Sequence, residues 1–205
     1  MGWAFVAVAY LLGSIPCGMV VAKLHGVDLR AAGSGNTGAT NALRVIGKTA
    51  GVITLLGDMA KGVLAVWLAL RFGGREFGCI AAGAAVIGHD FPVLTGFKGG
   101  KGVATSFGVV LMLEPLTGIA GLVLWILTVI AWRYSSLGAL VSFVAMPMVV
   151  VATKGGDMAL LLVSVFLMLM IILRHRSNIT RLINGDEPKV GRKTARNSNV
   201  TYDNS

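Results

Sequence analysis

The sequence predicts an all-α integral membrane protein with seven transmembrane helices. Of its 205 residues, 55% are hydrophobic and only 13% are charged, whereas a typical soluble domain has roughly 25% charged residues. The mean hydropathy is +0.78, and the apolar runs are too long and too numerous to form one soluble core. None of them alternates with a period of two, so a transmembrane β-barrel is not expected.

The first helix is predicted over residues 3–22. No basic segment precedes this run, and it is long enough to span a bilayer, so we expect a true membrane helix and not a cleaved signal peptide. Six more helices are predicted where apolar runs recur, over residues 49–70, 78–95, 103–113, 116–132, 136–153 and 158–173.

The fourth of these segments, residues 103–113, is too short to cross a bilayer alone. Its eleven residues would rise about 16 Å, against roughly 30 Å of hydrocarbon. Either residues 103–132 form one long helix, or Glu114 and Pro115 form a turn between two helices. A short fourth helix would leave polar loops partly embedded in the membrane, where irregular backbone survives only inside protein or beside a wet cavity.

The basic residues decide between six and seven spans. With seven spans and the N-terminus outside, Arg71, Arg75 and Lys154 lie outside and Lys61 lies within a helix. The remaining fourteen of the 18 Lys and Arg residues then face the cytoplasm. Six spans would move the C-terminal cluster to the other side and halve this bias, so the positive-inside rule favours seven. We expect residues 1–187 to form one membrane domain and residues 188–205 to form a polar, disordered tail.

Three polar stretches fall on the cytoplasmic side of this topology. They are 33–44 (GSGNTGATNALR), 88–105 (GHDFPVLTGFKGGKGVAT) and 174–187 (RHRSNITRLINGDE). Each combines glycines or small polar residues with Lys or Arg, which is the chemistry of a phosphate site. Tight loops without a function are the simpler alternative. We predict a polar pocket that opens to the cytoplasm and is sunk partly into the membrane.

Two familiar nucleotide motifs are excluded by their context. Gly33, Gly35 and Gly38 match G-x-G-x-x-G, but a membrane span precedes them where a strand is needed. The stretch GFKGGKG at 96–102 is one residue too short for a P-loop and has glycine where Ser or Thr should bind magnesium. The net charge of +9 is explained by topology, so no nucleic-acid partner is expected.

Asp58 and Lys61 lie in the middle of a predicted span and three residues apart, on one face of the helix. Charges at that depth are costly and are commonly functional. One interpretation is a structural ion pair. The other is that Lys61 turns toward the anion pocket and Asp58 orients it. The His residues show no metal-ligand spacing, so neither a metal ion nor another cofactor is predicted.

The three polar stretches closely resemble the signature motifs of the bacterial acyl-phosphate-dependent glycerol-3-phosphate acyltransferases. All three occur in order, and the resemblance runs from YLLGSIP at residues 10–16 to Glu187. It implies a multi-pass enzyme of the bacterial inner membrane with seven helices and a site facing the cytoplasm. The implied reaction moves a long-chain acyl group from acyl phosphate to the 1-hydroxyl of glycerol 3-phosphate, giving lysophosphatidic acid and phosphate. Functional coupling to the enzyme that supplies acyl phosphate is a further implied partnership.

The resemblance also implies the site residues. The candidate catalytic residues are Ser34, Asn36, Arg44, Lys101, His175 and Asn178. The candidate substrate- and phosphate-binding residues are Gly35, Thr40, Asn41, His89, Lys98, Gly99, Gly100, Gly102, Arg181 and Glu187, to which the argument from buried charge adds Lys61. The chain has no H-x-x-x-x-D pair of the kind that acyl-CoA-dependent glycerolipid acyltransferases use, which argues against a CoA thioester donor.

Two other classes of protein could use the same features. A transporter or channel for an organic phosphate would also need anion sites and broken helices, but no inverted repeat is evident. A lipid phosphotransferase would carry an acidic metal cluster, which the sequence lacks.

Overall fold

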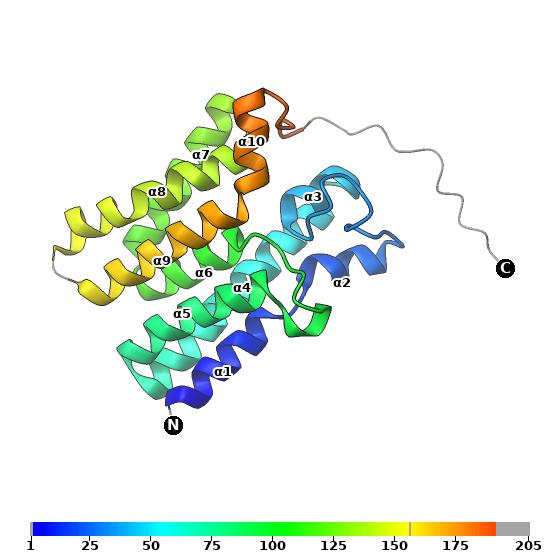
Figure 1. The fold of residues 1–205 in the computed structure, drawn as a ribbon. Helices are drawn as coiled ribbons and strands as arrows, with labels where there is room; N and C mark the ends of the chain where they lie inside the picture. The colour runs from blue at the N-terminus through cyan, green and yellow to red at the C-terminus, as the bar shows by residue number, and fades with distance from the viewer. Residues whose placement is uncertain (1, 156, 192–205) are drawn as a thin grey trace.

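The computed structural model describes residues 2–155 and 157–191, and within them it is a bundle of helices without a strand (Figure 1). The helices in chain order are α1 (Gly2–Gly13), α2 (Cys17–Leu24), α3 (Ala39–Val45), α4 (Lys48–Gly73), α5 (Arg75–Asp90), α6 (Val103–Leu113), α7 (Pro115–Trp132), α8 (Ser135–Lys154), α9 (Met158–Arg174) and α10 (Arg176–Asn184), with a 3-10 turn, η1 (Val93–Thr95), between α5 and α6.

Five segments are long and apolar enough to cross a membrane: Gly2–Leu24, Lys48–Gly73, Arg75–Thr95, Pro115–Trp132 and Ser135–Lys154. A sixth is formed if α9 and α10, which are bent by 61° against each other, count as one span, and α6 is a shorter apolar helix. The all-helical membrane fold is therefore confirmed, while the number of crossings stays a prediction.

The first span differs from the prediction, because it consists of two helices and not one. Ser14, Ile15 and Pro16 interrupt it between α1 and α2. Proline has no N–H to donate and its ring clashes with the preceding turn, so a helix breaks there. The helix predicted over residues 78–95 also ends early, because α5 ends at Asp90 and the residue before Pro92 is disfavoured in a helix.

Glu114 and Pro115 form a turn, so residues 103–132 form two helices and not one long helix. α6 ends at Leu113, Glu114 has an extended backbone, and Pro115 starts α7. Proline is well suited to the first position of a helix, where an N–H has no intrahelical partner. α6 is therefore a separate short helix that packs between α4 and α7.

Small residues let α1 and α5 approach closely. A side-chain carbon on Gly13 would lie 2.1 Å from the Ala85 carbonyl oxygen, and one on Gly88 would lie 2.2 Å from that of Tyr10. Without a hydrophobic drive between helices in lipid, such close packing supplies much of the association energy. It holds α5 firmly, and α5 carries His89 and Asp90 at its end.

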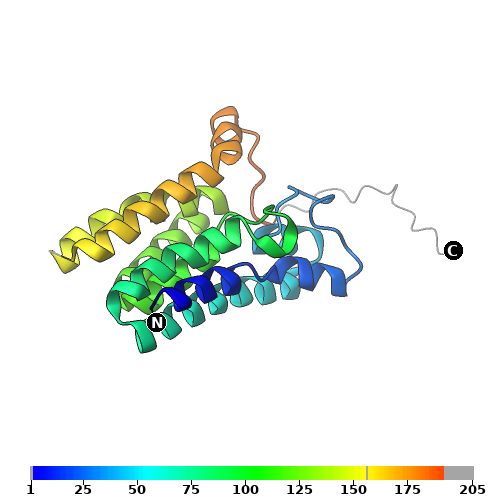
Figure 2. The same cartoon turned by 60° about the horizontal axis from the view of Figure 1, so that its bottom comes forward.

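The two ends of the bundle carry different kinds of connecting segments. At one end, Arg75 pairs with Asp157, and Lys154 Nζ lies 3.2 Å from Glu114 Oε1. The other end carries α2, α3, α10 and the glycine-rich turn before α6 (Figures 1 and 2). The three polar stretches thus gather at one end of the bundle, as the topology predicted.

Lys61 and Asp58 form a buried ion pair inside α4. Lys61 Nζ lies 2.8 Å from Asp58 Oδ1 and donates a hydrogen bond of 2.7 Å to the Ile15 carbonyl oxygen. That carbonyl lies at the break between α1 and α2, where the regular helical bonding stops. The pair therefore stabilises the break, which favours the structural interpretation of Lys61.

A Lys61→Met variant is expected to destabilise the protein by about 3–5 kcal/mol, because it removes the cation that lies nearest to the buried Asp58 carboxylate. It also removes one N–H donor to the Ile15 carbonyl oxygen and leaves the Cys17 N–H, at 3.1 Å. Thermal unfolding in detergent micelles, followed by circular dichroism, measures the effect. Lys48→Met, at the exposed start of the same helix, is the matched control. Equal melting temperatures in the two variants would contradict a structural role.

Candidate active site

A cavity of about 240 Å³ opens where the three polar stretches meet. It brings together most of the predicted site residues, which come from α3, α5, α10 and the loops beside them. Those that line it are Ser34, Asn36, Thr40, Asn41, Arg44, His89, Lys101, Gly102, His175, Asn178, Arg181 and Glu187. The sequence could not show this convergence, because the stretches are separated by whole helices.

The loop of the first stretch is organised by Asn41, which is 2% exposed. Its Nδ2 donates to the carbonyl oxygens of Leu29, Ala32 and Asn36, at 3.1, 3.0 and 2.9 Å, and its Oδ1 accepts from the Ser34 N–H at 2.9 Å. Every polar atom of the Asn41 side chain is thus bonded within the loop. Asn41 positions Ser34 and Asn36, and its predicted contact with a phosphate stays untested.

Arg44 lies on α3 and faces the cavity without a carboxylate partner. Among the described residues, no Asp or Glu oxygen lies within ion-pair distance of its guanidinium. Burial lowers the pKa of Arg44 below its ordinary value, but arginine stays charged in proteins. A half-buried cation that lacks a protein anion is suited to bind an anionic ligand.

Lys101 lies in the turn before α6, and its ammonium donates to Asn178 Oδ1 on α10. The second and third stretches are therefore in direct contact. Burial and the nearby cations Arg181, Arg174 and Arg44 together lower the pKa of Lys101 to about 8, against the opposing effect of Glu187. Binding of an anion would relieve this crowding of positive charge.

Glu187 joins the third stretch to α8. Its Oε1 accepts from Ser136 Oγ and from Asn178 Nδ2, both at 2.6 Å, and its Oε2 accepts from Arg181 Nε at 2.7 Å. These three hydrogen bonds outweigh burial and hold the pKa of Glu187 below its usual value. Because Asn178 Nδ2 is bonded to Glu187, its Oδ1 is directed toward Lys101.

His175 stands at the bend between α9 and α10 and is 3% exposed. Its Nδ1 lies 2.8 Å from the Ile171 carbonyl oxygen, which can only accept. Nδ1 must therefore carry a proton, and in the neutral form of the ring Nε2 is the unprotonated nitrogen. This nitrogen can accept a proton or a hydrogen bond at the cavity.

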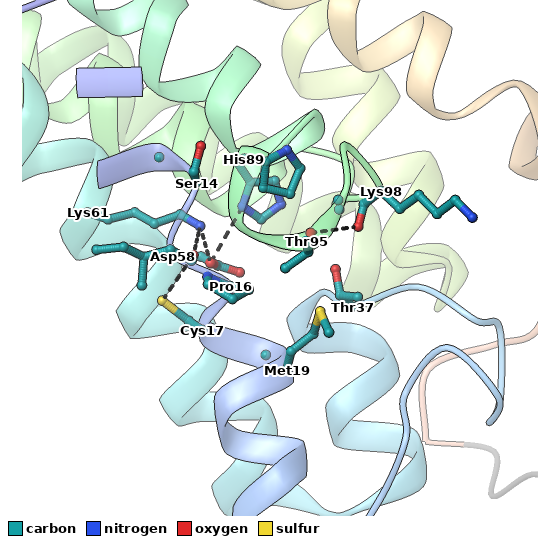
Figure 3. Close-up of a pocket in the computed structure, with 16 residues that line it drawn as sticks. Ser14, Pro16, Cys17, Met19, Thr37, Asp58, Lys61, His89, Thr95 and Lys98 are labelled. Atoms are coloured by element: carbon teal, nitrogen blue, oxygen red, sulfur yellow. Dashed lines mark hydrogen bonds and ion pairs between the residues drawn. The ribbon is translucent and has the colours of Figure 1, made fainter. Parts of the chain in front are cut away.

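Four of the five remaining predicted residues line a second cavity. Lys61, Lys98, Gly99 and Gly100 line a much smaller cavity of about 10 Å³, with space for about one water molecule. Figure 3 shows Asp58 between Lys61 and His89, whose Nδ1 lies 3.5 Å from Asp58 Oδ1, and shows Lys98 extending away from them. Gly35 lines neither of these two cavities. Roles for these residues in phosphate binding stay predictions.

Sequence reasoning missed several residues at the cavity. Ser135 Oγ lies 3.1 Å from Thr40 Oγ1, and Ser136 holds Glu187. The only signal for them was the position of Tyr134-Ser135-Ser136 directly after Arg133, on the predicted cytoplasmic side. Of the predicted tail, the structure describes residues 188–191, where the Val190 N–H donates to the Arg133 carbonyl oxygen at 2.7 Å. The predicted disorder of residues 192–205 concerns residues outside the described ones.

Apolar side chains also line the cavity. They are Leu43 of α3, Val52 and Leu55 of α4, and Trp125 of α7. A cavity that is lined by both cations and apolar side chains, within a bundle of membrane helices, defines a membrane protein that handles an amphiphile with an anionic head.

The comparisons with known proteins agree with this class. A family model for glycerol-3-phosphate acyltransferase matches residues 3–185, and the chain belongs to that family. The glycerol-3-phosphate acyltransferase of Syntrophotalea carbinolica is 47% identical over 183 residues, which cover 87% of this chain and 92% of the relative. That of Clostridioides difficile is 46% identical over 195 residues, which cover 91% and 94%.

Two solved structures share the fold. They are crystal structures of PlsY, an integral membrane glycerol 3-phosphate acyltransferase, in its glycerol 3-phosphate form and its lysophosphatidic acid form. The first is 39% identical with a TM-score of 0.89 and covers 93% of this chain and 96% of its own. The second is 38% identical with a TM-score of 0.86 and covers 92% and 94%. The resemblance of the three polar stretches to this family is thereby confirmed.

Proposed function

We propose that the protein transfers a fatty acyl group from acyl phosphate to the 1-hydroxyl of glycerol 3-phosphate, giving lysophosphatidic acid and inorganic phosphate. One observation carries the proposal: Arg44, which has no carboxylate partner in the described part of the chain, and Lys101 line one cavity that apolar side chains line as well. Both substrates carry a phosphate, and only the donor carries a long acyl chain. The cationic side chains of the cavity suit the phosphates, and its apolar side chains suit the acyl chain.

The cations would bind and orient the two phosphates. Arg44, Lys101 and the amides near Lys101 would hold one of them, and Ser34, Asn36 and amides near Asn178 would hold the other or donate to the oxygen that gains charge. The Gly100 N–H is already donated to the His89 carbonyl oxygen at 3.2 Å, so the Lys101 and Gly102 amides are the better candidates. Much of the rate would come from this positioning.

The reaction itself needs little assistance, because acyl phosphate is a mixed anhydride with a good leaving group. The substrate hydroxyl oxygen attacks the acyl carbon, and the bond from that carbon to the phosphate oxygen breaks with its electrons on phosphate. The hydroxyl proton passes either to a phosphate oxygen or to His175 Nε2, which is the best placed protein base. No step requires a metal ion or another cofactor.

The position of the cavity supports a place in the bacterial inner membrane with the site facing the cytoplasm. Among the described residues, the bundle end that carries the cavity also carries the inside-facing basic residues of the seven-span topology. In that orientation the N-terminus is outside, the C-terminus is cytoplasmic, and soluble glycerol 3-phosphate reaches the cavity from the cytoplasm. The acyl phosphate would come from the membrane, and coupling to the enzyme that supplies it is part of the proposal.

The experiment incubates the purified protein with labelled glycerol 3-phosphate and one of three donors: acyl phosphate, acyl-CoA or acyl carrier protein thioester. The expected result is labelled lysophosphatidic acid with acyl phosphate alone. Product from a thioester donor would refute the assigned donor. No product with any donor, together with uptake of glycerol 3-phosphate into vesicles containing the protein, would favour a transporter.

The activity should fall as the pH rises above about 8. Lys101 is cationic below its pKa of about 8 and neutral above it, so its attraction for phosphate is lost in that direction. The kcat/KM for glycerol 3-phosphate, which reports groups of the free enzyme, should fall about tenfold per pH unit once Lys101 is deprotonated. Lys101→Arg, which stays charged throughout, is the control and should lack this fall. Identical profiles for the two proteins would contradict the assignment.

A further inference from the structure

Arg174, the last residue of α9, donates hydrogen bonds to the backbone of the turn that carries Lys101. Arg174 Nη2 donates to the carbonyl oxygens of Gly100 and Gly99, at 2.6 and 3.3 Å, and Arg174 Nε donates to that of Gly100 at 3.1 Å. Arg174 does not line the larger cavity. It contacts the backbone of the turn and not the space where a substrate would bind.

This bonding fixes the direction of the next amide. In a planar trans peptide the C=O of one residue and the N–H of the next point in opposite directions. Because Arg174 holds the Gly100 carbonyl, the Lys101 N–H is directed away from Arg174. Lys101 and Gly102 line the larger cavity, whereas Arg174 does not. An N–H that points away from Arg174 is therefore free to point into this cavity.

Arg174 is itself oriented by two residues at the end of α5. Its guanidinium carbon lies 5.0 Å from the centre of the Phe91 ring, a cation–π arrangement. Its Nε lies 3.9 Å from Asp90 Oδ2. Asp90 is fully buried, and among the described residues neither of its carboxylate oxygens has a hydrogen-bond partner. A buried carboxylate of this kind is costly, so a charge role toward Arg174 explains its presence.

We propose that Arg174, oriented by Asp90, is a positioning residue for the acyl transfer. It holds the Gly99 and Gly100 carbonyls in place and so directs the Lys101 amide N–H at a substrate phosphate. This inference rests on the proposed function. The positioning role needs the planar guanidinium of arginine, because a lysine ammonium could not bond both carbonyls in the same geometry.

The test measures kcat/KM with acyl phosphate and glycerol 3-phosphate for Arg174→Ala and Arg174→Lys. A misplacement of about 1 Å at a reacting centre can cost about 100-fold, and that loss is expected for Arg174→Ala. Arg174→Lys keeps the charge but should still lose about tenfold, since it keeps one bond at most. Arg176→Ala, an exposed arginine two residues on, is the matched control and should keep the activity of the unmodified protein.

Chemical rescue separates positioning from a loss of stability. Guanidinium chloride, far below denaturing concentration, should restore much of the activity of Arg174→Ala and none of that of Lys101→Met. Asp90→Asn should lower activity in the unmodified protein but add little to Arg174→Ala, because the two residues act through one contact.

Full activity of Arg174→Lys would overturn the inference, since charge alone would then suffice. Absence of rescue in a folded Arg174→Ala protein would also overturn it. Inactivity of the unmodified protein and of Arg176→Ala with acyl phosphate would instead refute the proposed function. The two failures are therefore distinguishable.

Discussion

A Lys101→Met variant is expected to lose roughly two to three orders of magnitude in kcat/KM, the usual effect of removing one donor that stabilises developing charge. The loss has two physical causes. The phosphate loses a buried cation, and Asn178 Oδ1 is left as a bare acceptor beside it. Asn178 cannot turn its amide to compensate, because its Nδ2 is donated to Glu187 at 2.6 Å.

The measurement for Lys101→Met is steady-state acyl transfer by protein in detergent, with the fold checked by thermal unfolding. Lys48→Met removes the same charge from the exposed start of α4 and should keep full activity. A Lys101→Met rate close to that of Lys48→Met would show that the assigned phosphate contact is wrong.

An Arg44→Ala variant is expected to lose about 100-fold in kcat/KM with little change in stability. Arg44 has no ion-pair partner within the described part of the chain, so its removal leaves no protein anion unpaired. The effect should therefore appear in activity and not in the melting temperature. The activity of Arg44→Lys should lie between that of the unmodified protein and that of Arg44→Ala, because lysine keeps the charge and loses the bidentate geometry.

Arg71→Ala, at the far end of α4, is the matched control for Arg44. It removes an exposed arginine that stacks near Phe72, 5.5 Å from the ring centre. A fall in melting temperature for Arg44→Ala with activity unchanged would assign Arg44 to structure and remove it from the site.

Much of the fold could be predicted from hydrophobic runs, because a membrane helix is recognised in a sequence by its length and composition. The interruptions of helices within an apolar run were harder to predict. Pro16 lies inside an apolar run that still reaches across the bilayer in length, so composition did not reveal that α1 ends at Gly13. α3 and α10 are short and polar, so the apolar pattern that marks the spans does not mark them.

The site could be predicted as three stretches but not as a set of contacts. Glycines with Lys, Arg and Asn indicated anion binding, and the structure brings Arg44 and Lys101 to one cavity. The sequence could not separate residues that face the cavity from residues that hold its walls. Asn41 and Arg174 look like ligands by residue type, yet their hydrogen bonds are made with backbone groups of the loops. Only tertiary packing decides that difference.

The most direct test of the account is a crystal structure of this protein with bound glycerol 3-phosphate. We expect the phosphate in the cavity between α3 and the turn before α6, at a hydrogen-bond distance of about 3 Å from Lys101 or Arg44. A phosphate found behind the glycine turn, against Lys61 and Lys98, would contradict it.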